Sequence, residues 1–155
     1  MTGEPLTTGN PLPQVSVEGP EGPVTLDALL GGRALVVVFY VEDRTPTCTA
    51  QLSALGADQE LIEGLGARLV GISSDGAESH ASFSEECDLA FPLLTDAGLE
   101  AARAFGVADE ATGRCMRAVF VSDRVGVIIE AIPHYNPANP SQYEAIFAAL
   151  GMDVS

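Results

Sequence analysis

A continuous apolar run that leads directly into a helix start constrains this chain more than any other feature. Residues 33–40 read Arg-Ala-Leu-Val-Val-Val-Phe-Tyr. Such a run of β-branched and aromatic residues is typical of a strand buried on both faces. Thr45 and Pro46 follow it closely, and they are a favourable N-cap and a favourable first helical residue. The sequence therefore predicts a buried strand followed at once by a helix.

Cys48 is the third residue of that predicted helix. Its backbone N–H is then placed to donate a hydrogen bond to the Thr45 hydroxyl, and its sulfur lies at the positive end of the helix dipole. A thiol in this environment ionises more easily than a free cysteine, and the thiolate is the nucleophilic form. We therefore expect Cys48 to be an activated nucleophile.

The order of the other elements indicates the fold class. A loose lead-in at 1–13, a loop at 107–115 and a hairpin joining the last two strands are expected. The order is strand, helix, strand and helix, followed by a hairpin and a last helix. This order predicts an α/β thioredoxin-like fold, with a central mixed sheet flanked by helices and an N-terminal extension. Right-handed crossovers make the strands at 33–40 and 67–73 parallel neighbours. No repeat or long linker divides residues 1–155, so we expect a single domain. The expected strands cover residues 14–17, 24–26, 33–40, 67–73, 91–94, 116–121 and 125–132, and the expected helices cover 26–30, 46–64, 74–87, 95–105 and 141–150.

Charge and composition exclude several classes of function. The net charge is −15, because 22 acidic residues face only seven basic ones, all of them arginine. Such a surface repels nucleic acid and anionic membranes. No apolar run is long enough to span a membrane and no signal peptide is evident, so a cytoplasmic protein is expected. Three widely spaced cysteines and two isolated histidines, His80 and His134, predict neither a disulfide framework nor a metal or other cofactor.

Several separated motifs resemble one known family. The segment Phe39-Tyr40-x-x-Asp43-x-Thr45-Pro46-x-Cys48-Thr49-x-Gln51-Leu52 closely resembles the active-site segment of peroxiredoxins, most of all in the branch of bacterioferritin comigratory protein, also called peroxiredoxin Q. The resemblance covers nearly the whole chain. Further matches, in the family's order, are Gly9-x-Pro11-x-Pro13, Gly71-Ile-Ser73, His80-x-x-Phe83, Phe91-Pro-Leu-Leu-x-Asp96 and Arg117-x-x-Phe120-Val-x-Asp123.

The resemblance implies a thiol peroxidase. Cys48 would be the peroxidatic cysteine, which attacks the peroxide O–O bond and becomes a sulfenic acid. Thr45 would orient the peroxide, and Arg117 would favour the thiolate and stabilise charge on the peroxide oxygens, roles that suit a hydroxyl and a guanidinium. The implied partners are a peroxide and either thioredoxin or another small thiol. The resemblance also implies a monomer or a weak dimer.

The residues expected around Cys48 include one departure from the family pattern. The family has a proline seven residues before the cysteine, and this chain has Val41 there, which restores a backbone N–H. Tyr40 is expected either in the pocket wall or in the core. Gln51, one helical turn past Cys48, is expected either to hydrogen-bond near the site or to be exposed to solvent.

A second departure concerns the recycling of the sulfenic acid. Many family members carry a resolving cysteine five residues after the first, where this chain has Ser53. Cys87, on the helix after the second buried strand, is one candidate resolver, and Cys115, two residues before Arg117, is another. The remaining interpretation is a one-cysteine mechanism with an external thiol. These departures also leave open a redox-sensing protein with weak peroxidase turnover.

Overall fold

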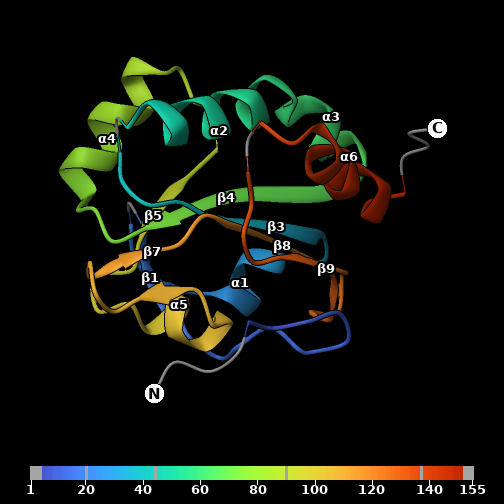
Figure 1. Cartoon of the computed structure of the whole chain (residues 1–155). Coiled ribbons are helices and arrows are strands. Elements are labelled where there is room, and N and C mark those ends of the chain that lie inside the picture. The colour runs from blue at the N-terminus through green and yellow to red at the C-terminus, as the bar shows by residue number, and fades with distance from the viewer. Residues whose placement is uncertain (1–4, 20, 44, 90, 137, 152–155) are drawn as a thin grey trace.

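The computed structural model describes residues 5–19, 21–43, 45–89, 91–136 and 138–151, and at residues 46–48 it describes the backbone alone. Within these ranges one seven-stranded mixed sheet has the order β2-β1-β5-β4-β3-β8-β9, and β6 pairs with β7 in a second, two-stranded sheet (Figure 1). The strands are β1 (Ser16–Gly19), β2 (Gly22–Thr25), β3 (Ala34–Phe39), β4 (Ala67–Ser73), β5 (Leu93–Thr95), β6 (Ala108–Asp109), β7 (Arg114–Cys115), β8 (Ala118–Ser122) and β9 (Ile128–Ile132).

The strand that precedes Cys48 lies inside the sheet. β3 is buried along its whole length, and it pairs in parallel with β4 and antiparallel with β8. Side chains alternate between the two faces of a strand, so Val36 and Val38 enter one hydrophobic cluster while Val37 and Phe39 enter the other. This confirms the prediction of a strand that is buried on both faces.

Helices cover both faces of the sheet, which confirms the predicted fold class. In Figure 1, α2 (Pro46–Ala57), α3 (Gln59–Gly64), α4 (Ala77–Glu86) and α6 (Pro140–Ala149) lie above the sheet, and α1 (Leu26–Leu30) and α5 (Glu100–Phe105) lie below it. In the described ranges, no helix combines the length and the apolar character that crossing a membrane requires.

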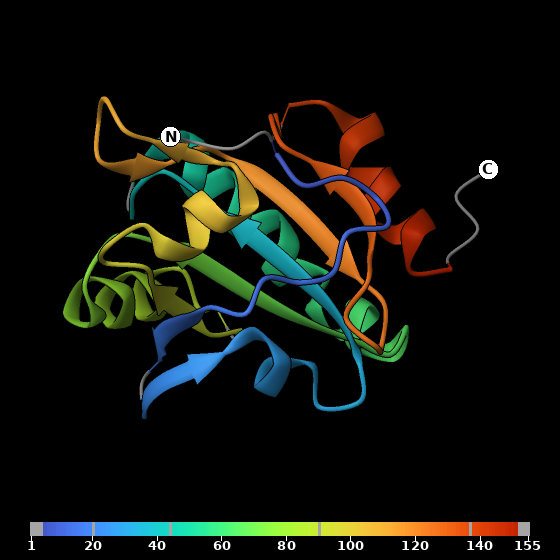
Figure 2. The ribbon, with the colours of Figure 1, turned by 90° about the horizontal axis from the view of Figure 1, so that it is seen from below.

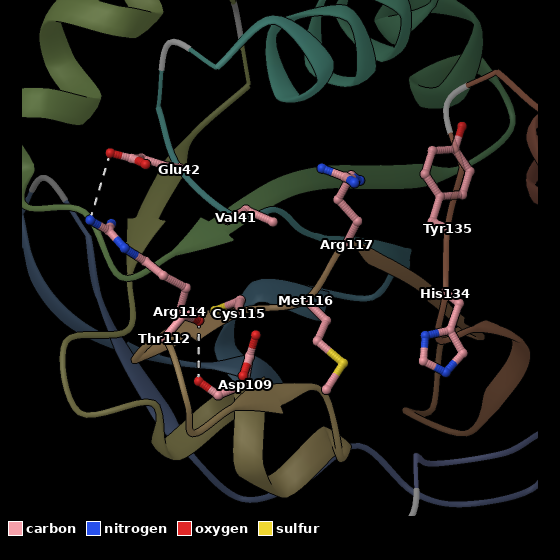
Figure 3. A pocket seen from close by; sticks show the side chains of 10 residues that line it. All are labelled: Val41, Glu42, Asp109, Thr112, Arg114, Cys115, Met116, Arg117, His134 and Tyr135. Carbon is pink, nitrogen blue, oxygen red and sulfur yellow. Dashed lines mark hydrogen bonds and ion pairs between the residues drawn. The ribbon is translucent and has the colours of Figure 1, made fainter.

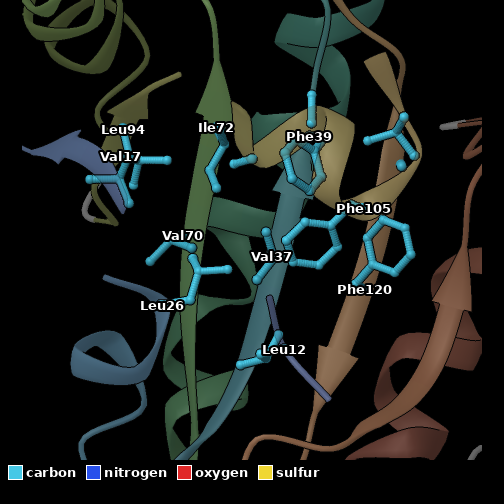
Figure 4. Close-up of a cluster of buried hydrophobic side chains, with 14 of the residues drawn as sticks. Leu12, Val17, Leu26, Val37, Phe39, Val70, Ile72, Leu94, Phe105 and Phe120 are labelled. Carbon is cyan, nitrogen blue, oxygen red and sulfur yellow. The ribbon is translucent and has the colours of Figure 1, made fainter. Parts of the chain in front are cut away.

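The hydrophobic cluster that contains Val37 and Phe39 lies on the lower face of the sheet, and the one that contains Val36 and Val38 lies on the upper face. An aromatic group forms the centre of the lower cluster (Figure 4). The rings of Phe39 and Phe105 have centroids 5.0 Å apart, and those of Phe105 and Phe120 are 4.8 Å apart. The three residues come from β3, α5 and β8 and are fully buried. Burial of each ring contributes about 1.5–3 kcal/mol, so this contact fixes α5 on the sheet.

The N-terminal segment is bound to the sheet, in contrast to the loose lead-in expected for residues 1–13. The backbone N–H of Leu12 donates to the carbonyl of Gly126, and that of Ile128 donates to the carbonyl of Asn10, each at 2.8 Å. The Leu12 side chain is buried in the lower cluster. Figure 2 shows the segment crossing the face that carries α1 and α5. The described part of the lead-in therefore closes the lower core.

The long helix expected over residues 46–64 is two helices. α2 ends at Ala57 and α3 begins at Gln59, with Asp58 between them at φ −103° and ψ 13°. The hydroxyl of Tyr143, on α6, hydrogen-bonds to the Asp58 carboxylate and to the carbonyl of Ala54 at 2.9 Å. This contact comes from a residue far along the chain, and it stabilises the turn between the two helices.

Two other elements also differ from the sequence prediction. The helix expected from residue 95 begins at Glu100, and the Asp96 carboxylate accepts hydrogen bonds from the backbone N–H groups of Ala101 and Ala102 at 3.1 and 2.8 Å. Asp96 thus caps the helix from outside it. The loop expected over residues 107–115 contains the short antiparallel pair β6 and β7. Gly113 has a φ of +71°, which favours glycine in the turn between them.

Candidate active site

The nucleophile helix begins at the carboxyl end of a central strand, as predicted. β3 ends at Phe39, a short loop follows, and α2 begins at Pro46 with Thr45 as its N-cap. The backbone of Cys48 lies in the first turn of α2, while its side chain is outside the described part of the chain. First-turn N–H groups carry partial positive charge, so this position favours an anionic thiolate.

The Thr45 hydroxyl does not make the expected capping hydrogen bond. It donates to the backbone carbonyl of Glu42 at 3.1 Å, and no capping bond from this side chain to a described N–H of α2 is formed. The Thr45 carbonyl accepts the backbone N–H of Thr49 at 2.8 Å. The prediction that Thr45 caps the Cys48 N–H is therefore wrong. The bond to the Glu42 carbonyl uses the proton of the hydroxyl, so its oxygen can still accept a hydrogen bond.

A cavity of about 570 Å³ opens beside the loop that leads to α2 (Figure 3). Its walls come from that loop, from the β6–β7 hairpin, from the residues just before β8 and from the loop after β9. It brings together Val41 and Arg117, two of the predicted site residues. The lining residues are Val41, Glu42, Asp109, Thr112, Arg114, Cys115, Met116, Arg117, His134 and Tyr135.

Arg117 is a half-buried cation that no described carboxylate pairs with. Its backbone carbonyl accepts the N–H of Tyr135 at 3.0 Å, which holds two walls of the cavity together. An arginine without an ion-pair partner keeps its donors available for a ligand. This is notable in a chain of net charge −15.

Arg114 differs from Arg117 because its guanidinium is engaged. It lies 3.1 Å from the Asp75 carboxylate and 3.6 Å from the Glu42 carboxylate. Figure 3 shows it reaching from the β6–β7 hairpin to the loop that precedes α2. Arg114 therefore holds the loop beside the cavity.

The two described cysteines differ in environment. Cys115 lines the cavity but is buried, and burial raises the pKa of its thiol from 9.0 to about 12, with the charges of Asp96 and Asp75 acting in the same direction. It is therefore a neutral thiol at physiological pH and a poor nucleophile. Cys87 follows the last residue of α4, is half-buried and packs against the upper hydrophobic cluster. Its role as a resolving cysteine stays a prediction.

Tyr40 and Gln51 lie in the interior. Neither is among the residues that line the cavity. Tyr40 is fully buried, and burial followed by its hydrogen bond to Asp43 raises the pKa of its hydroxyl far above the ordinary value. Gln51 is only 1% exposed, so the solvent-exposed alternative is wrong. Its amide nitrogen donates to the Phe39 carbonyl at 3.5 Å, and its amide oxygen has no described partner.

Sequence reasoning missed the polar cluster around Tyr40. The hydroxyl of Tyr40 donates to Asp43 at 2.6 Å, and His80 lies against both side chains. His80, which is isolated in the sequence, is a buried residue with hydrogen-bond partners on both ring nitrogens. Only the match of Asp43 and His80 to the family motifs could have drawn attention to them.

Comparison with known proteins settles the family. The model of the AhpC/TSA family matches residues 8–131. The chain belongs to the AhpC/TSA family. It is 37% identical over 125 residues to the chloroplastic peroxiredoxin Q of Sedum lineare, and the matched segment covers 79% of this chain and 67% of that protein. The chain spans only 57% of the length of a similar rice peroxiredoxin Q, to which it is 33% identical over 79% of its own length.

Solved structures support the same branch. Peroxidoxin BcpB from Mycobacterium tuberculosis superposes with a TM-score of 0.86 at 26% identity, covering 97% of this chain and 99% of that one. The bacterioferritin comigratory protein of Xanthomonas campestris, solved in a study of its alkyl peroxide reduction activity, superposes with a TM-score of 0.75 at 28% identity, covering 88% and 90% of the two chains. The chain is thus a peroxiredoxin of the peroxiredoxin Q branch, with the thioredoxin-like fold and the thiol-dependent peroxidase class of that family.

Proposed function

We propose that this peroxiredoxin reduces hydrogen peroxide and organic hydroperoxides at Cys48. The Cys48 thiolate attacks one peroxide oxygen, the O–O bond breaks, and the other oxygen leaves as an alkoxide or hydroxide that takes up a proton. Cys48 is oxidised to a sulfenic acid, and the peroxide is reduced to an alcohol or to water. The observation that carries the proposal is the guanidinium of Arg117, which pairs with no carboxylate of the described residues and lies in the cavity beside the loop that leads into α2.

Arg117 and Thr45 supply the polar groups that this reaction needs. The leaving oxygen develops negative charge, and a fixed guanidinium stabilises that charge more in the transition state than in the ground state. The Thr45 hydroxyl, which donates to Glu42, orients the peroxide by accepting its O–H hydrogen. Val41 replaces the proline of the family pattern and keeps an apolar side chain at the cavity wall.

The size and the lining of the cavity support organic hydroperoxides as substrates. A volume of about 570 Å³ is far larger than hydrogen peroxide needs. Val41, Met116 and Tyr135 provide apolar contacts beside Arg117. The Xanthomonas campestris relative was studied for alkyl peroxide reduction, which agrees with this substrate class.

A thiol reductant returns Cys48 to the reduced state. We propose that either Cys87 or an external thiol resolves the sulfenic acid, with thioredoxin or another small thiol as the electron donor. A Cys87 mechanism requires the Cα atoms of Cys48 and Cys87 to come within roughly 7 Å of each other, the reach of a disulfide. A cytoplasmic protein that is a monomer or a weak dimer stays a prediction from the sequence.

The proposal is tested by the consumption of peroxide. The reduced wild-type protein, mixed with hydrogen peroxide or with cumene hydroperoxide, should remove one equivalent quickly and continue in the presence of dithiothreitol. Cys48→Ser should abolish both phases, while Cys87→Ser should leave the first equivalent intact. Rapid consumption by Cys48→Ser would overturn the proposal.

The alternative function is a peroxide sensor that turns over slowly. Val41 and Ser53, which stand where relatives carry a proline and a resolving cysteine, favour it. The same experiment separates the two functions. A sensor consumes the first equivalent of peroxide but then stalls with both thioredoxin and dithiothreitol, whereas a peroxidase continues with at least one of them.

A further inference from the structure

A buried carboxylate anchors the loop between β3 and α2. The Asp43 side chain is 1% exposed and accepts three hydrogen bonds. The donors are the hydroxyl of Tyr40 at 2.6 Å, the hydroxyl of Ser79 at 2.7 Å and Nδ1 of His80 at 3.0 Å. We call Tyr40, Asp43, Ser79 and His80 the Asp43 cluster. A buried carboxylate is costly without such partners, and here it has them from β3's end and from α4.

His80, on α4, connects the Asp43 loop to β5. Its Nε2 lies 3.1 Å from the backbone carbonyl oxygen of Leu94, on β5, and its Nδ1 faces Asp43. The ring is 4% exposed and bridges the loop to β5. Movement of the loop therefore breaks contacts to two separate elements.

The backbone of the loop is held as firmly as the Asp43 side chain. The N–H of Asp43 donates to the Asp75 carboxylate at 2.9 Å. That carboxylate also accepts the hydroxyl of Ser73 at 2.7 Å and forms the ion pair with Arg114. The loop residue Asp43 is thus fixed through two independent groups, its carboxylate and its amide.

This anchorage connects to the first turn of α2 through two hydrogen bonds. The Thr45 hydroxyl donates to the carbonyl of Glu42, the neighbour of Asp43, at 3.1 Å. The Thr45 carbonyl accepts the N–H of Thr49, directly after Cys48, at 2.8 Å. The position of Asp43 therefore determines where Thr45 and the helix start lie.

We propose that Tyr40, Asp43 and His80 are positioning residues for Cys48, which they serve by holding the loop and the first turn of α2 in the reactive arrangement. This inference rests on the proposed function and deepens it. Hydrogen bonds are directional, so a carboxylate with three donors fixes a loop more narrowly than apolar packing of the same volume. None of the three residues contacts the cavity, so they act through the loop and not on the peroxide.

The test compares Tyr40→Phe, His80→Asn and Asp43→Asn with the wild-type protein. Alkylation of Cys48 by iodoacetamide is followed across pH, together with backbone hydrogen exchange over residues 45–50. Each cysteine lies in its own tryptic peptide, since cleavage at arginine gives residues 45–68, 69–103 and 115–117. Tyr143→Phe is the matched control, because it also removes a tyrosine hydroxyl from a carboxylate, that of Asp58 at the far end of α2.

We expect each cluster variant to shift the pH midpoint of Cys48 alkylation upward and to speed exchange in the first turn of α2. Single-turnover reaction with peroxide should slow by at least about tenfold, the effect of a small misplacement of reacting groups. Tyr143→Phe should lower the thermal midpoint without moving the alkylation midpoint. Tyr40→Phe is the mildest change and keeps the test available if Asp43→Asn does not fold.

The outcomes separate this inference from the proposed function. Folded cluster variants with a wild-type alkylation midpoint and wild-type exchange would overturn the inference, even with peroxide turnover intact. A wild-type protein that does not reduce peroxide would overturn the proposed function, and the alkylation and exchange measurements would still report on the cluster. A midpoint shift of equal size in Tyr143→Phe would also overturn the inference, because it would show a general loss of stability.

Discussion

The backbone carbonyl of Arg117 accepts the N–H of Tyr135 at 3.0 Å, and this bond joins the start of β8 to the loop after β9. It fixes the backbone of Arg117 while the guanidinium remains without a described carboxylate partner. A fixed backbone and an unpaired cation are what a preorganised electrostatic site requires. The proposed reaction of Cys48 with peroxide relies on that combination.

Arg117→Gln should slow the reaction with peroxide by about 10²–10³-fold, the usual loss when one donor to a developing oxyanion is removed. Thermal stability should change little, since no described ion pair is broken. Stopped-flow peroxide reduction and thermal unfolding measure the two effects. Arg103→Gln, which removes an exposed ion pair with Glu110, is the control with the same charge change and should react like wild type. Equal rates for both variants would argue against a role for Arg117.

Arg114→Gln should loosen the loop before α2 with little loss of global stability. Its ion pairs with Glu42 and Asp75 involve a guanidinium that is 34% exposed, so the effect on unfolding should stay below about 1 kcal/mol. Hydrogen exchange at residues 41–43 should rise, and peroxide reduction should slow several-fold. Because salt screens such pairs, the difference between wild type and variant should shrink near 1 M salt, where the Debye length is about 3 Å. A salt-independent difference would contradict this explanation.

Acid should release the loop through Asp43. Burial opposes ionisation of this carboxyl, but the hydrogen bonds from His80, Tyr40 and Ser79 outweigh it and hold its pKa below the ordinary 3.8. A depressed folded pKa stabilises the protein above the unfolded pKa, and this stabilisation is lost as pH falls through the folded value. Exchange at residues 41–49 should therefore rise as pH falls below about 4. Asp43→Asn should lack that rise, and the difference between the two proteins isolates Asp43 from other carboxylates.

Cys115 should resist alkylation in the folded protein. The pKa of its thiol, about 12 and raised by burial, keeps it neutral, whereas the half-buried Cys87 should react before Cys115 does. The same shift makes stability fall as pH rises above 9.0, because the unfolded thiol ionises there and the folded thiol does not. Cys115→Ala should flatten that part of the stability curve between about pH 9 and 12. Fast labelling of Cys115 at pH 8 without denaturant would refute this description.

Local sequence patterns predicted much of the fold. β4 covers residues 67–73 as expected, and α1 covers residues 26–30, because apolar runs and glycines mark those elements within a few residues. The interruption at Asp58 was not predictable in this way. It depends on Tyr143, which is 85 positions away along the chain and reaches Asp58 only when α6 packs beside α2.

The candidate site was predictable only in part, for the same physical reason. Val41 and Arg117 meet at one cavity because β8 lies beside β3, and the family motifs had pointed to both. The partners of Tyr40 and Thr45 were missed. Tyr40 contacts His80, 40 positions later in the chain, only because α4 packs over the sheet. The Thr45 hydroxyl donates to the Glu42 carbonyl, and the direction of that carbonyl depends on the conformation of the loop.

The most direct test is the identity of the cysteine that peroxide oxidises. The reduced protein is treated with one equivalent of hydrogen peroxide, trapped with dimedone or with an alkylating agent, digested and analysed by mass spectrometry. We predict that the oxidation lies on the peptide 45–68, either as a Cys48 sulfenic acid adduct or as a disulfide linking Cys48 to Cys87 on the peptide 69–103. Oxidation confined to Cys87 or Cys115, with Cys48 still a free thiol, would contradict the account.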